Sequence, residues 1–266
     1  MTISDSDLTA QLRPEIPHAA RIWNYWMGGV DNYPADRAAG DAVAGVYPEI
    51  RLMARDSRRF LTRAVRFLAA ERGIRQFLDI GTGLPAMQNT HEIAREIAPE
   101  SRTVYVDKDP LVLVHARALL GAAGSDEHVT YLQADYYEPE KILEQAARTL
   151  DFGKPVAVMF MGVMGYEPDL GVVRSIIDRV VAATASGSYL VFWDSTDTTP
   201  SVVEGAKRLV ESGGDEYHLR SQADLASVFT GLELVEPGLA QITAWHADAD
   251  AEPEQTDAFG GVARKP

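Results

Sequence analysis

Acidic residues and glycines stand where several apolar runs of this chain end. Asp79, Gly81 and Gly83 form an Asp-x-Gly-x-Gly turn after one run, and Asp107 and Asp135 end the next two. Glycines at the carboxyl end of a buried strand let the backbone approach a ligand, and an acid on a neighbouring strand can bind both hydroxyls of a ribose. The spacing therefore predicts a site for an adenosine-containing ligand.

The glycine turn differs from the turn that binds dinucleotides. Ala86 stands where the third glycine of Gly-x-Gly-x-x-Gly belongs, and Pro85 interrupts the turn. The carboxylate of Asp79 would repel a pyrophosphate, but it suits the ammonium and sulfonium charges of S-adenosylmethionine. We therefore expect S-adenosylmethionine as cofactor, with Asp107 accepting from its ribose and Asp135 from its adenine amino group. The predicted cofactor site comprises Arg21, Asp79, Gly81, Thr82, Gly83, Asp107, Lys108, Asp135, Tyr136, Met161 and Gly162.

Composition limits the class of protein. The chain has 266 residues, of which 46% are hydrophobic, and this is enough for one large α/β domain. The formal net charge of −14 opposes binding to a phosphate backbone, so we expect no nucleic-acid partner. The sequence shows neither an apolar run long enough for a membrane span nor a signal segment, which predicts a cytoplasmic protein. No cysteine is present, and no His or Asp spacing is typical of a metal site.

Strand-like and helix-like segments alternate along the chain, which predicts a parallel sheet. The predicted strands are 75–80, 103–106, 129–133, 156–161 and 189–193, with 232–235 and 242–245 closing the sheet as a hairpin. The predicted helices are 57–70, 91–97, 109–120, 141–150, 170–185 and 221–229. We expect a Rossmann-like α/β fold, with a mostly parallel seven-stranded sheet and helices on both faces.

Several longer stretches resemble one known family. They are residues 21–33 (RIWNYWMGGVDNY), 35–37, 76–85 (QFLDIGTGLP), 104–110 (VYVDKDP), 134–135, 187–191, 231–238 and 261–265. In these stretches the chain resembles the actinobacterial S-adenosylmethionine-dependent methyltransferases once catalogued only as a domain of unknown function. The resemblance implies the class I methyltransferase fold and a methyl-transfer activity. The chain departs from the pattern at Phe192-Trp193-Asp194, where Ser-His is expected, and at Ala258-Phe259.

The amino-terminal part mixes aromatic side chains with glycines and polar residues. Aromatic rings can cover adenine or a planar substrate, and paired glycines can bend a segment over a site. We therefore expect residues 1–56 to form an arm or lid and residues 57–266 to form the S-adenosylmethionine-binding domain. Arg21 is expected to bind the carboxylate of the cofactor's methionine part, because arginine binds carboxylates through two parallel N–H groups. The alternative is a helix whose aromatic side chains pack on the sheet, with Arg21 in a surface ion pair. The predicted lid or substrate residues are Tyr25, Trp26, Gly28, Gly29, Asn32 and Tyr33.

No residue pattern assigns the chemistry of the acceptor. The segment 161–167 after the fourth strand is best placed to contact it, and this segment lacks the Asp/Asn-Pro-Pro-Tyr sequence of amino-methylating nucleic-acid enzymes. The candidates for catalysis are Glu167, Tyr166, Asp194 and His91, with Tyr136 and His18 as further proton acceptors.

Three functions remain open from the sequence. The leading one is an S-adenosylmethionine-dependent methyltransferase with a small-molecule acceptor. The alternatives are a regulatory or interaction protein that binds S-adenosylmethionine without turnover and, with less support, a nicotinamide-dependent oxidoreductase. The acceptor and the oligomeric state are not assigned.

Overall fold

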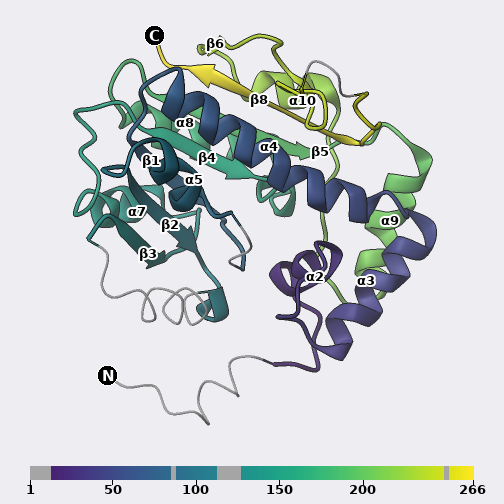
Figure 1. The fold of residues 1–266 in the computed structure, drawn as a ribbon. Helices are drawn as coiled ribbons and strands as arrows, with labels where there is room; N and C mark the ends of the chain where they lie inside the picture. The colour runs from purple at the N-terminus through teal and green to yellow at the C-terminus, as the bar shows by residue number, and fades with distance from the viewer. Residues whose placement is uncertain (1–12, 85–87, 113–126, 249–251) are drawn as a thin grey trace.

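The fold is built on one sheet whose central strands are parallel (Figure 1). The computed structural model describes residues 13–84, 88–112, 127–248 and 252–266. The strands run in the order β3-β2-β1-β4-β5-β8-β6, and β7 pairs with β8. Their bounds are β1 Gln76–Ile80, β2 Arg102–Asp107, β3 Val129–Gln133, β4 Ala157–Met161, β5 Tyr189–Ser195, β6 Glu233–Leu234, β7 Ala240–Gln241 and β8 Ala258–Arg264.

Alternating residues of the strands enter two separate cores. Phe77 of β1 and Met159 of β4 pack on one face of the sheet, whereas Leu78 and Val158 pack on the other. The first face is covered by α4 (Ile50–Ala70) and α5 (Thr90–Ile97), and the second by α7 (Pro139–Ala146), α8 (Leu170–Ala182) and α10 (Gln222–Ser227). Both faces of the central strands are therefore buried, which explains their nearly continuous apolar sequences.

The end of the sheet differs from the sequence prediction. Residues 242–245 form no strand, and the predicted hairpin of 232–235 with 242–245 is wrong. The last strand, β8, pairs antiparallel with β5 and separates it from the short β6. Strand β8 has no alternating sequence pattern because both of its faces are buried: Gly260, Val262 and Ala263 are all in the interior.

The predicted helix 109–120 is described only at its beginning. Asp109 Oδ1 accepts a hydrogen bond from Leu111 N at 2.8 Å, which is the expected cap of a helix start. Residues 113–126 lie outside the described residues.

The amino-terminal helices lie at the end of the sheet toward which β4 and β5 point (Figure 1). They are α2 (Ala19–Trp26) and α3 (Pro34–Val46), and α3 packs against α9 (Pro200–Glu211). Helix α4 begins at Ile50, so it runs across the domain boundary predicted between residues 56 and 57. Side chains of α2, α3 and α4 share one apolar core with the sheet. No helix in the described part of the chain combines the length and apolar character needed to cross a bilayer.

Candidate functional site

A cavity of about 440 Å³ opens at the carboxyl edge of the sheet. One wall is formed by residues that follow β1, β2, β3 and β4, and the other by α2, α3, α4, α9 and the segment 215–219. Of the predicted cofactor residues, nine line it: Asp79, Gly81, Thr82, Gly83, Asp107, Lys108, Tyr136, Met161 and Gly162. Ligand cavities of parallel sheets form at this edge, where strand ends from distant parts of the chain meet.

The glycine turn after β1 is held by backbone contacts. Gly81 has a φ of +74°, and a Cβ atom at this position would lie 2.3 Å from Cγ2 of Val163. Its N–H donates to the carbonyl oxygen of Val106 on β2 at 2.8 Å. Glycine is therefore required here both by backbone conformation and by the close approach of the segment after β4.

Asp107 joins the glycine turn to the beginning of the next helix. Its Oδ2 accepts from Gly83 N at 2.8 Å, and its Oδ1 accepts from Asp109 N at 2.9 Å. Burial raises the pKa of Asp107, although these two backbone hydrogen bonds lower it. A carboxylate has about four lone-pair sites, so both oxygens can still accept from ribose hydroxyls.

Asp79 shares the cavity lining with a cation, Arg58, that the sequence pattern did not indicate. Its Oδ2 accepts from Thr90 Oγ1 at 2.9 Å, and burial raises its pKa to about 6 against the lowering effects of that hydrogen bond and of Arg58. Arg58, on α4, also lines the cavity. Its Nη2 lies 3.4 Å from Asn89 Oδ1, and its buried Nε has no acceptor among the described residues. A carboxylate and a guanidinium thus face one end of the cavity together.

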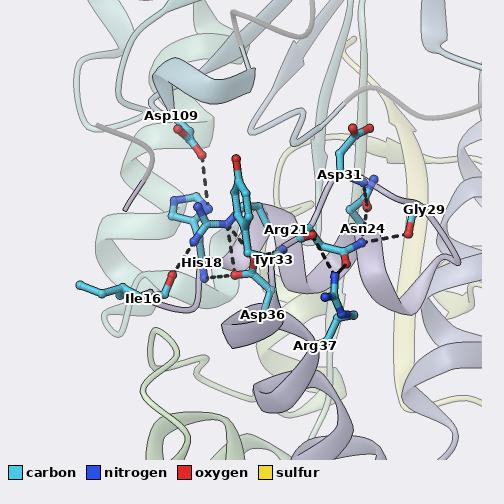
Figure 2. A network of polar contacts seen from close by, with 11 residues as sticks. Ile16, His18, Arg21, Asn24, Gly29, Asp31, Tyr33, Asp36, Arg37 and Asp109 are labelled. Carbon is cyan, nitrogen blue, oxygen red and sulfur yellow. Dashed lines mark hydrogen bonds and ion pairs between the residues drawn. The ribbon is translucent and has the colours of Figure 1, made fainter. Parts of the chain in front are cut away.

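Helix α2 covers the cavity through its apolar side. Trp23, Trp26 and Met27 line the cavity, and the ring of Trp23 stacks on Trp193 of β5 with centroids 5.9 Å apart. At the start of the helix, His18 Nδ1 lies 3.3 Å from Asp109 Oδ2 (Figure 2). The arm is therefore joined to the sheet edge both at β5 and beside Asp107.

The polar residues of the arm bind one another (Figure 2). Arg21 Nε lies 2.9 Å from Asp36 Oδ2, and the carboxylate of Asp36 also accepts from the backbone N–H groups of His18 and Tyr33. Arg21 further donates to the carbonyl oxygen of Ile16, and it does not line the cavity. The predicted contact of Arg21 with a methionine carboxylate is thus not part of this arrangement, because a buried guanidinium needs a partner and finds Asp36.

The loop between α2 and α3 is organised in the same way. Asn24 Oδ1 accepts from Asp31 N at 3.1 Å and from Asn32 Nδ2 at 3.0 Å, and Asn32 Nδ2 also donates to Gly29 O at 2.9 Å (Figure 2). Tyr25 donates to the exposed Asp41. Of the predicted lid residues, Trp26 lines the cavity, whereas Tyr25, Gly28, Gly29, Asn32 and Tyr33 do not.

Asp135 and three catalytic candidates also lie outside the cavity lining. Asp135 Oδ1 accepts from Tyr137 N at 3.1 Å, so it caps a local turn. Glu167 accepts from the hydroxyl of Tyr137 and from Asp169 N. His91 Nδ1 contacts Tyr105 Oη at 2.9 Å, and Asp194 is fully buried. Of the candidates for catalysis, Tyr166 lines the cavity, as do Tyr136 and His18.

The structure adds an aromatic part to the lining of the cavity, formed by residues outside the glycine turn. We call it the acceptor end; its walls include Trp23, Trp26, Tyr166, Trp193, Leu209 and Tyr217. Leu209 lies in α9 and Tyr217 follows it, and the sequence did not predict this helix. Both residues are also far from the glycine turn in sequence, so no local pattern could indicate them. Among the described residues, no group of three or more His, Asp or Glu side chains could hold a metal ion.

Comparisons with known proteins agree with this site. The sequence profile of a family described as S-adenosyl methyltransferase matches residues 5–266. The structure of a DUF574 family protein from Streptomyces avermitilis is 41% identical, with a TM-score of 0.89, and the alignment covers 95% of this chain and 99% of that one. A Thermobifida fusca structure provisionally described as a methyltransferase is 36% identical, with a TM-score of 0.89 and coverage of 98% and 99%.

A more distant structure shows the shared fold. Mitomycin 7-O-methyltransferase is 18% identical, with a TM-score of 0.53 and coverage of 97% of this chain and 75% of that one. A search of curated proteins gave no match. The class I methyltransferase fold and the cofactor expected from the glycine turn are thus those of the matching family, and the nicotinamide-dependent alternative has no support from it. The chain belongs to the S-adenosyl methyltransferase family, and it is an S-adenosylmethionine-dependent methyltransferase whose acceptor is unidentified.

Proposed function

We propose that this methyltransferase acts on a small organic acceptor that enters the aromatic end of the cavity. The observation that carries this proposal is the continuity of the cavity: the glycine turn and the acceptor end line one space of about 440 Å³. A cavity of this size suits small ligands, which are typically bound in about 300–1,000 Å³. S-adenosylmethionine supplies the methyl group, carried on a positively charged sulfur.

The residues at the sheet edge fit the chemical groups of this methyl donor. We assign the ribose hydroxyls to Asp107, the close backbone approach to the turn 81–83, and the donor's ammonium group to Asp79. Tyr136, Lys108, Met161 and Gly162 complete this end of the lining. Because Asp79 and Arg58 carry opposite charges and line the same cavity, they match the ammonium and carboxylate of an amino acid.

Arg58 is the residue that we assign to the donor's carboxylate, in place of Arg21. Arg21 is already neutralised by Asp36, whereas the buried Nε of Arg58 has no acceptor among the described residues. A buried N–H without an acceptor costs roughly 1–3 kcal/mol, and a carboxylate bound at the guanidinium would recover part of that cost.

Calorimetric titration with S-adenosylhomocysteine, the demethylated product, tests this assignment. The variant Arg58→Gln should weaken binding at least about tenfold, because a charged hydrogen-bonded pair is lost. Arg55→Gln is the matched control, since Arg55 is exposed on the same helix, and it should bind as the wild type does. Equal affinities of the two variants would contradict the role of Arg58.

Transfer of a labelled methyl group tests the class of acceptor. The protein would be incubated with methyl-labelled S-adenosylmethionine and a cell extract separated into small molecules, proteins and nucleic acids. We expect label in the small-molecule fraction, since Asp215 and Glu216 line the cavity and oppose a phosphate backbone. Label in the nucleic-acid fraction would contradict the proposal. The cytoplasmic location stays a prediction.

A further inference from the structure

The acceptor end combines aromatic walls with acidic side chains. Trp23, Trp193 and Tyr166 supply flat faces, and Asp215 and Glu216 also line this end. His218 also lines the cavity, and its Nδ1 lies 3.9 Å from Glu216 Oε1. Flat apolar faces bind planar molecules, and the two carboxylates repel anions. The composition of this end therefore favours uncharged or cationic aromatic molecules over carboxylates and phosphates, to the modest extent that exposed carboxylates allow.

Tyr217 places its hydroxyl between the acceptor end and the donor end, by which we mean the lining residues assigned to the methyl donor. Its ring packs on Gly165, where a Cβ atom would lie 2.2 Å from Cζ of the tyrosine, and edge-on against Tyr166 with centroids 5.0 Å apart. Its Oη lies 3.2 Å from the carbonyl oxygen of Gly162, which follows β4 in the lining of the donor end. Tight packing thus fixes the hydroxyl beside the strand end from which the methyl donor is contacted.

A buried carboxylate lies directly behind this hydroxyl. The Oη of Tyr217 donates to Asp194 Oδ1, which also accepts from Ser195 N at 3.0 Å. Asp194 Oδ2 lies 3.5 Å from Arg220 Nη1 and has no hydrogen-bond donor among the described residues. Arg220 itself is buried and donates to the carbonyl oxygens of Met164 and Glu167. The carboxylate therefore has a free acceptor capacity and a fixed cation beside it.

The protonation of Asp194 is balanced near neutrality. Burial raises the pKa of Asp194 to about 6, and the hydrogen bond from Tyr217 and the charge of Arg220 oppose this rise. Burial and the adjacent carboxylate keep the pKa of Tyr217 well above its usual value, so Tyr217 stays protonated. Asp194, which already accepts the hydrogen bond from Tyr217, is therefore the group on which a proton arriving at Tyr217 can come to rest.

We propose that the acceptor is an uncharged aromatic molecule with a hydroxyl or N–H at its reacting atom, and that Tyr217 receives its proton and passes its own to Asp194. The inference rests on the proposed function of the cavity. As the acceptor atom gains the methyl group, the carbon–sulfur bond breaks and its electron pair stays on sulfur. The acceptor's proton moves to Tyr217 Oη, and the hydroxyl proton of Tyr217 moves to Asp194 Oδ1. After the methylated product has left, the proton returns by way of Tyr217 to water in the cavity, because Asp194 itself is fully buried.

Three probes of similar size test the binding part of this inference. Phenol, toluene and benzoate would be titrated by ligand-observed NMR into protein saturated with S-adenosylhomocysteine. Phenol should bind at least about fivefold more tightly than toluene, since it alone can donate to Tyr217, and benzoate should bind at least about tenfold more weakly than phenol. In Tyr217→Phe, phenol and toluene should bind within about twofold of each other, with the affinity for toluene unchanged.

A control and two contrary outcomes complete this experiment. Tyr189→Phe removes a hydroxyl at the opposite end of β5, outside the cavity lining, and should leave the preference for phenol intact. If the protein binds S-adenosylhomocysteine but binds phenol no more tightly than toluene, or binds benzoate as tightly as phenol, this inference alone is overturned. A wild-type protein that binds no S-adenosylhomocysteine would overturn the proposed function and this inference with it.

The pH dependence of phenol binding tests the role of Asp194. The groups that face Asp194 are Tyr217 and Arg220, and the charge of Asp194 also raises the pKa of Tyr166. None of these three side chains is expected to change charge between pH 5 and 8. Phenol binding should weaken several-fold as the pH falls through about 6, since a protonated Asp194 no longer holds the hydroxyl of Tyr217 as a donor. Asp194→Asn should abolish this dependence. A pH dependence that survives in Asp194→Asn would overturn the proton route.

Discussion

The carboxyl edge of the sheet and the amino-terminal arm both carry dense polar sequence, and they use it differently. At the edge, Asp79 and Asp107 are held by a few hydrogen bonds and still line the cavity. In the arm, Arg21 and Asp36 satisfy each other away from the cavity. Polar residues in a motif can therefore bind a ligand only where the fold leaves some of their hydrogen-bonding capacity open.

The largest effect should come from the arm, on stability. Asp36→Asn removes the charge that faces Arg21 in a buried position, and breaking such a pair by removing one partner costs roughly 3–5 kcal/mol. Urea denaturation would measure the loss, and titration of the remaining folded protein with S-adenosylhomocysteine should show an affinity within about threefold of the wild type. Asp41→Asn is the control on the same helix, because Asp41 is exposed in its pair with Arg51 and should cost at most about 1 kcal/mol. An Asp36→Asn variant that is as stable as the wild type but binds S-adenosylhomocysteine more weakly would show that Asp36 serves the ligand and not the stability of the arm.

The next effect should come from the edge, on binding. Asp107→Ala should weaken binding of S-adenosylhomocysteine by at least roughly 1–3 kcal/mol, the scale of hydrogen bonds to a charged group. It also removes the acceptors for Gly83 N and Asp109 N, so some loss of stability is expected. Calorimetry at a temperature where the variant is folded separates the two effects. Unchanged affinity in the folded variant would contradict the assignment of the ribose to Asp107.

The sequence predicted those parts of the molecule that depend on local patterns. The succession of β1 to β5 along the chain and the turn around Gly81 follow from alternation and from glycine spacing, and the structure has them. It could not predict that β8 separates β5 from β6, because this antiparallel pairing joins segments far apart in the chain. Tyr217 escaped prediction for the same reason, since only the fold brings it to Asp194 and Gly162.

The arm shows a different limit of sequence reasoning. A run such as Asn24 to Asp36 has the composition of a functional site, and composition does not tell whether polar groups bind each other or a ligand. Arg58 shows the converse, because on an amphipathic helix such as α4 an arginine has the pattern of a solvated residue. The decisive fact was geometric: α4 places Arg58 in the cavity lining together with Asp79, and α2 and α3 place Arg21 on Asp36.

A smaller effect should appear as a pH dependence of donor binding. Without ligand the pKa of Asp79 is raised to about 6, so its carboxylate is ionised at pH 7 and largely protonated at pH 5. An ammonium group prefers the ionised form, so the affinity for S-adenosylhomocysteine should rise up to about tenfold from pH 5 to 7 and then level off. Asp79→Asn should bind more weakly and lose most of this dependence. An affinity that falls from pH 5 to 7 would exclude Asp79 as the partner of a cation.

The smallest effect should come from the third acid of the strand ends. Asp135 resembles Asp107 in sequence, since both end a strand, but its Oδ1 accepts from Tyr137 N and the residue does not line the cavity. Because an asparagine oxygen can accept the same hydrogen bond, Asp135→Asn should change the affinity for S-adenosylhomocysteine by less than about threefold in the calorimetric titration used for Asp107. A tenfold loss of affinity for S-adenosylhomocysteine would assign Asp135 to the cofactor site again. It would show that an acid's position at a strand end, more than its exposure to the cavity, decides whether it binds the donor.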